Sequence, residues 1–108
     1  MKIYGVLKGC VTDAEARAAL TQVADVTSFN DDGATWGKMR GLLDGDPAGW
    51  IGVAILLVPP GHEWVVRSIL HATVYRPDQI DWVLRGEAQR PDCALAIAAL
   101  RARRLCRS

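Results

Sequence analysis

Cysteine, long apolar runs and excess charge are all scarce in this sequence, and each shortage excludes a class of protein. The chain of 108 residues has three cysteines, an odd and sparse number that argues against a secreted disulfide scaffold and favours the cytoplasm. Its longest uncharged apolar run is about half of the 20 residues that span a bilayer, so we expect no membrane helix and no membrane partner. The net charge of +1 gives no general attraction to nucleic acids. We expect one globular domain over residues 1–108.

Residues that could bind a metal or perform catalysis are also few and badly spaced. Neither the cysteines (Cys10, Cys93 and Cys106) nor the histidines (His62 and His71) show ligand spacings such as Cys-x2-Cys or His-x3-His. The glycines match no phosphate-binding loop. The sequence therefore predicts a non-enzymatic protein with no metal, no cofactor and no catalytic residues.

An uncharged apolar run between Asp46 and Gly61 is the feature around which we expect the fold to be organised. Asp46 followed by Pro47 is typical of a helix start, because the aspartate oxygen caps the first amides and proline presets the first helical φ. The Pro-Pro-Gly sequence at the other end prevents the helix from continuing. We therefore predict a buried central helix over residues 46–58.

Other helix starts come from capping signals elsewhere in the chain. Thr12 and Glu15 have the spacing of a capping box, in which each side chain accepts a hydrogen bond from the other residue's amide. Two Arg-Pro-Asp tripeptides place proline at a first helical position and an acid in the first turn. Residues 1–9 alternate weakly and predict an extended segment. The capping signals predict helices over residues 12–26, 77–85 and 92–106, and we expect a further short helix over residues 35–43.

Residues 62–76 can be interpreted in two ways. In a helix, Glu63, Arg67, His71 and Tyr75 recur at every fourth position and form one polar stripe opposite an apolar face. If the segment is a strand, its side chains alternate between two faces. Burying one face puts a serine inside, and burying the other leaves large apolar side chains exposed. We therefore predict a helix here, although the segment contains many β-branched residues.

The expected fold class follows from this choice. We predict an all-α protein, a compact bundle of five to six short helices with an extended N-terminal segment. The alternative is an α+β fold, in which residues 50–58 and 63–75 form a hairpin across the proline-glycine turn.

The C-terminal helix carries four arginines near its end, more than its dipole requires. A basic patch there could bind phosphate groups or an acidic protein surface, whereas the simpler interpretation is that these charges only complement the helix end. The residues concerned are Arg101, Arg103, Arg104 and Arg107.

Tryptophans and aspartates supply the other candidate binding residues. Trp64 and Trp82 fall at or near the polar sides of their predicted helices, and tryptophan is frequent among residues that dominate interfaces. Asp31 and Asp32 could belong to an acidic surface that competes for a basic groove, or they could simply form a turn.

These features together predict a small protein that blocks a surface of a larger protein or nucleoprotein complex. The alanine- and arginine-rich composition is compatible with a phage or mobile-element origin, so we consider an anti-CRISPR-like anti-defence protein and an immunity protein as specific forms. The alternative is a small nucleic-acid-binding regulatory module that uses the arginine-rich C-terminal helix.

Overall fold

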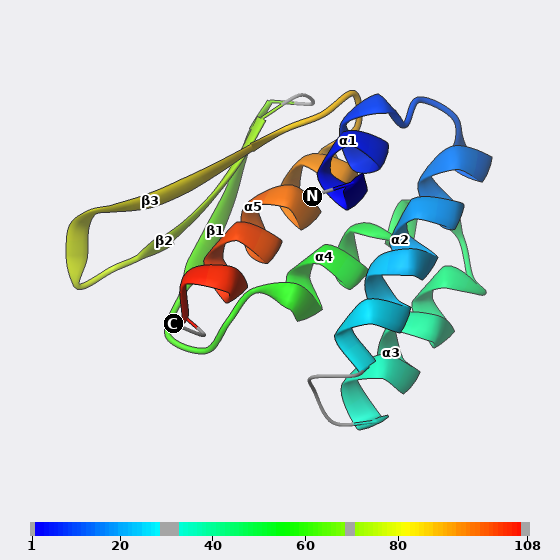
Figure 1. Cartoon of the computed structure of the whole chain (residues 1–108), viewed down its shortest axis with the longest axis horizontal. Helices are drawn as coiled ribbons and strands as arrows, with labels where there is room; N and C mark the ends of the chain where they lie inside the picture. The colour runs from blue at the N-terminus through cyan, green and yellow to red at the C-terminus, as the bar shows by residue number, and fades with distance from the viewer. Residues whose placement is uncertain (1, 29–32, 69–70, 107–108) are drawn as a thin grey trace.

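A computed structural model of the protein describes residues 2–28, 33–68 and 71–106 and has an α+β fold. The strands form one antiparallel sheet in the order β1-β2-β3, and the helices lie to one side of it (Figure 1). The prediction of an all-α bundle is therefore wrong, and the alternative class, α+β, is confirmed. The elements in chain order are α1 (Lys2–Gly9), α2 (Asp13–Ser28), α3 (Gly33–Leu43), the 3-10 helix η1 (Pro47–Gly49), α4 (Ile51–Leu57), β1 (Glu63–Ser68), β2 (His71–Arg76), β3 (Gln79–Glu87) and α5 (Pro91–Cys106).

The N-terminal segment forms helix α1 and not the extended segment that was predicted. Ile3, Tyr4 and Leu7 lie on one side of this helix, where Leu7 is fully buried and the other two are partly buried against the core. The sequence alternates weakly, but the helical period places these three side chains together. Burial of one apolar side decided the conformation.

The capping box at the start of α2 is confirmed. The amide of Glu15 donates to Thr12 Oγ1 at 3.2 Å, and the amide of Thr12 donates to Glu15 Oε1 at 3.0 Å. The helix that follows buries Ala16, Ala19, Leu20, Val23 and Ala24.

The central apolar run is helical, as predicted, but it contains two helical elements. Asp46 Oδ1 accepts from the Ala48 amide at 2.8 Å and caps η1, after which α4 begins at Ile51. Gly52 lets α3 approach closely, since a Cβ at this position would lie 2.9 Å from a methyl carbon of Leu42. The alternative fold was predicted to contain a hairpin of residues 50–58 and 63–75. That hairpin is wrong, because residues 51–57 form helix α4.

Glu63–Ser68 and His71–Arg76 pair as the antiparallel strands β1 and β2, so the helix predicted over residues 62–76 is also wrong. Glu63 pairs with Tyr75, and Val65 pairs with Thr73. The strand interpretation was rejected because it exposes apolar side chains, yet Val65 is indeed 38% exposed. The sheet tolerates this because only one of its faces is packed against helices.

The two Arg-Pro-Asp tripeptides have different structures. The second one opens α5 at Pro91, as predicted. In the first, Arg76 ends β2 and Pro77 and Asp78 form the turn to β3, so the helix predicted over 77–85 is wrong. The tripeptide is compatible with both a turn and a helix start, so the residues that follow it decide the outcome.

A charged cluster joins the starts of two helices to the central run. Arg90 donates to Asp13 at 2.6 Å and to Asp92 at 3.1 Å, and its guanidinium carbon lies 5.9 Å from the centre of the Trp50 ring. The Asp92 side chain is only 6% exposed, so Arg90 supplies the partner that a buried carboxylate requires.

Helix α5 is the element on which most of the fold packs. It contacts α1, α4 and all three strands, and a run of its residues from Asp92 to Ala99 is buried. At Gly86 in β3, the main chain of the strand lies directly against the main chain of α5. A Cβ there would lie 2.0 Å from the carbonyl oxygen of Ala94 and 2.7 Å from the amide nitrogen of Ala98. Glycine in the strand and alanine in the helix therefore set the spacing between sheet and helix.

Replacing Gly86 with alanine should strongly destabilise the protein. The added methyl group has to push α5 backbone away from β3, and overpacking of this kind costs about 2 kcal/mol or more. Urea denaturation would measure the loss in the free energy of unfolding. The matched control is Gly41→Ala in α3, where a Cβ meets nothing within 4 Å. That variant should gain about 0.5 kcal/mol from helix propensity. Equal effects at both positions would contradict the close approach of α5 and β3.

Candidate functional site

The helices pack against one face of the sheet through α5, and the other face carries exposed side chains. The strand register places Val65, Thr73 and Arg85 opposite one another on this second face. Residues that alternate with them, such as Val74 on β2, are buried on the α5 side. We call the second face the open face, and its described residues are Glu63, Val65, Arg67, His71, Thr73, Tyr75, Val83, Arg85 and Glu87.

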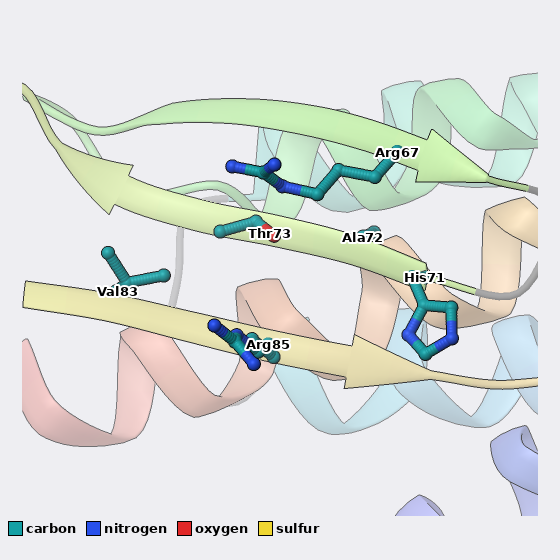
Figure 2. A pocket seen from close by; sticks show the side chains of 6 residues that line it. All are labelled: Arg67, His71, Ala72, Thr73, Val83 and Arg85. Atoms are coloured by element: carbon teal, nitrogen blue, oxygen red, sulfur yellow. The ribbon is translucent and has the colours of Figure 1, made fainter.

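A hollow of about 400 Å³ lies on the open face around Thr73. Figure 2 shows Arg67 on β1 and Arg85 on β3 at either side of Thr73, with Val83 toward one end and His71 toward the other. Thr73 is only 4% exposed although it points away from α5, since it sits between side chains of both outer strands. The hollow is therefore lined by cationic, hydroxyl and apolar groups.

The acidic side chains on the open face have partners among the described residues, whereas two of its basic side chains have no ion pair with one. Glu63 Oε2 accepts from the Tyr75 hydroxyl at 2.8 Å, and this hydrogen bond raises the pKa of Tyr75. Glu87 Oε1 lies 3.6 Å from His71 Nδ1. Neither the Arg67 nor the Arg85 guanidinium has an ion pair with another described residue. The face therefore offers guanidinium groups to an anionic ligand.

A second hollow, of about 300 Å³, adjoins the first at Arg85 and lies between β3, α1 and α5. Lys8 and Arg101 line it together with Arg85. Arg101 lies over the ring of Tyr4, with its guanidinium carbon 5.5 Å from the ring centre. We use the term basic band for the four cationic residues that line the two hollows, Lys8, Arg67, Arg85 and Arg101.

The predicted C-terminal arginines are only partly available as a patch. Arg101 Nη1 donates to the carbonyl oxygen of Arg85 at 2.6 Å, and Arg103 Nε donates to that of Leu57 at 2.6 Å. Arg104 is exposed, and Arg107 lies outside the described residues. Arg101 lines the second hollow, and the role of the set in binding stays a prediction.

Trp64 is the other predicted binding residue whose side chain belongs to the described part of the structure. Trp64 is 37% exposed and lies on β1, at the edge of the sheet. Trp82 belongs to β3, but its side chain is outside the described part of the structure. Asp31 and Asp32 also lie outside the described residues. The binding role of these residues stays a prediction.

Sequence reasoning missed Lys8, Arg67, Arg85 and Val83 as parts of one surface. The helix predicted over 62–76 separated Arg67 from Arg85, and only the strand register brings them to the two sides of Thr73. The available signal was the density of β-branched and aromatic residues from Trp64 to Trp82, which is typical of strands.

Nucleophiles and metal ligands are not gathered on the open face. The thiols of Cys10 and Cys93 are buried at 2% and 0% exposure, and this burial raises the pKa of each. Among the residues that the structure describes, no group of three or more His, Cys, Asp or Glu side chains could hold a metal ion. Within the same residues, no helix combines the length and apolarity needed to cross a bilayer.

Comparison of the chain with known protein families, with curated protein sequences and with solved structures finds no significant match. The open face and the charges around it are therefore the features that bear on function.

The two buried thiols should resist alkylation while the protein is folded. At pH 8 a thiol with a raised pKa stays protonated, and burial also blocks access of the reagent. We expect iodoacetamide to modify Cys10 and Cys93 about a hundredfold more slowly in buffer than in urea, where the chain is unfolded. Peptide mass mapping would read each cysteine separately. Modification of Cys93 at the same rate in both conditions would contradict its burial.

Proposed function

We propose that this protein is a non-enzymatic binding protein that docks its open face and basic band against an acidic surface of a larger protein. The observation that carries the proposal is the convergence of Lys8, Arg85 and Arg101 beside the open face, on which Val65 and Val83 are exposed. These cationic groups come from α1, β3 and α5, so the fold itself brings them together.

The chemistry of this surface matches carboxylate side chains. A guanidinium group binds a carboxylate through two parallel hydrogen bonds, and Arg85 lies where both hollows meet. Val65 and Val83, at 38% and 43% exposure, supply apolar area beside the charges. Burying them on contact would exclude water from the ion pairs, which strengthens such pairs.

Occlusion is the mode of action that fits such a surface. A small protein that covers an acidic patch prevents that patch from binding its own basic ligand. This is the behaviour proposed from the sequence for a cytoplasmic inhibitor, either an anti-CRISPR-like protein of a phage or mobile element or an immunity protein.

The alternative proposal is nucleic-acid binding through the arginine-rich end of α5. It receives less support, because Arg101 and Arg103 donate to main-chain carbonyls of β3 and α4 and so have fewer donors left for phosphate. Binding of this kind would weaken steeply as the salt concentration rises.

The test compares two variants with the same change of charge. Lys8→Glu/Arg85→Glu reverses two charges of the basic band, whereas Lys38→Glu/Arg104→Glu reverses one lysine and one arginine exposed on α3 and α5. Partners captured from a nuclease-treated lysate of the native host would be identified by mass spectrometry, produced pure and titrated by calorimetry. We expect the basic-band variant to lose affinity by about tenfold or more and the control to stay within about threefold.

Two outcomes would overturn the proposal. One is an equal loss of affinity in both variants, which would place the contact outside the basic band. The other is binding of nucleic acid but of no purified protein, with the larger loss in the variant that carries Arg104→Glu, which would favour the alternative. Thermal unfolding of both variants checks that they are folded.

A further inference from the structure

The two edges of the sheet differ in how far the described residues cover them. At the β3 edge, Arg101 donates to the main-chain carbonyl of Arg85, and side chains of α1 line the hollow beside it. At the β1 edge, no side chain of the described residues makes a hydrogen bond to the main chain of Glu63–Ser68, and Trp64, Val65 and Arg67 are exposed. An uncovered edge strand presents unpaired amide and carbonyl groups to another strand.

The side chains of β1 are arranged so that the strand complements itself. We infer that two copies of this chain pair antiparallel through β1, about a two-fold axis at Val65, and form a continuous six-stranded sheet. Residues opposite each other in an antiparallel pair share a face of the sheet, so the axis at Val65 places Glu63 opposite Arg67 of the second copy. Trp64 then lies opposite Val66 of the second copy on the other face.

This register is selected by charge. Each Glu63 meets an Arg67, and the symmetry produces the ion pair twice. An axis at Trp64 would place Glu63 opposite a valine, and an axis at Val66 would place Arg67 opposite a valine. Of these three axes, only the one at Val65 places opposite charges next to each other. The axes at Trp64 and Val66 would each leave a charged side chain facing a valine.

The geometry of the single chain leaves both charged groups ready for this contact. Glu63 uses Oε2 to accept from Tyr75, and no described residue bonds to its Oε1. Arg67 lies where the β1–β2 register shifts between Val66 and Ser68, yet its side chain lines the hollow on the open face beside Thr73 (Figure 2). Glu63 and Arg67 are therefore both accessible on the face where the register pairs them.

The pairing also accounts for apolar exposure at this edge. Trp64 and Val65 are 37% and 38% exposed, and a second β1 strand would bury part of each side chain. Of the exposed large apolar residues that the structure describes, two neighbours thus lie on the strand whose edge is uncovered. The dimer leaves Lys8, Arg85 and Arg101 free at the opposite edge of the sheet, and Arg67 is the one residue of the basic band that it shares with the proposed docking surface.

A charge-swap series would test the dimer. Light scattering and sedimentation equilibrium over a concentration range would measure the dimer dissociation constant of the whole chain. We expect the wild-type protein to reach twice the chain mass. Glu63→Arg and Arg67→Glu should each raise the dissociation constant by about tenfold or more, since each creates two like-charge contacts per dimer. The double variant Glu63→Arg/Arg67→Glu restores both ion pairs and should return to within about threefold of wild type.

The matched control is Lys8→Glu/Arg85→Glu, which should leave the dissociation constant unchanged, so a failure of the proposed function can be told from a failure of the dimer. Circular dichroism of each variant reports whether it is folded. A wild-type protein that stays monomeric at all concentrations would overturn the inference. A dimer that the single reversals do not weaken, or that the swap does not restore, would place the contact on another surface and overturn it equally.

Discussion

The contact between Gly86 and α5 is the constraint on which the rest of the structure depends. Sheet and helix meet at backbone distance, because glycine has no Cβ and because the facing positions of α5 are alanines. A buried, alanine-rich α5 can then pack on one side against the strands and on other sides against α1 and α4. One helix is thereby shared between the sheet and the helical half of the protein, and the second face of the sheet carries exposed side chains.

That arrangement determines what the molecule can offer to a partner. Side chains that alternate along each strand fall into a buried set on α5 and an exposed set on the open face. The exposed set combines valines with guanidinium groups, and its two glutamates already have partners in Tyr75 and His71. The helical half contributes Lys8 and Arg101 at the β3 edge, which extends the positive charge beyond the sheet.

Local chemistry predicted some elements well and failed at others for identifiable reasons. The capping box at Thr12 and the Asp-Pro start at Asp46 were interpreted correctly, because the hydrogen bonds that define them lie within a few residues of each other. Two identical tripeptides had different outcomes, since Pro91 is followed by alanines that pack as a helix, whereas Pro77 is followed by a strand that pairs with β2.

The candidate site was less predictable than the fold for the same reason. Of the residues predicted to bind, Arg101 lines the second hollow, but Arg67 and Arg85 come together only through the register of β1, β2 and β3. Glu63, Arg67, His71 and Tyr75 do share a face, as predicted. The spacing of four that indicated a helix is also a multiple of two, the period of a strand, so Glu63 and Arg67 share a face of β1 and His71 and Tyr75 share a face of β2. The register, which pairs Glu63 with Tyr75, then puts both pairs on the same face of the sheet.

The central claim is that the sheet packs on α5 with one face and exposes the other. Its most direct test compares two valines of neighbouring strands, Val83 on the open face and Val74 on the α5 side, which are 43% and 0% exposed. A soluble gadolinium chelate added to methyl-labelled protein broadens the NMR signals of methyl groups that solvent reaches. We predict strong broadening for Val83 and almost none for Val74. Equal broadening of the two signals would contradict the arrangement described here.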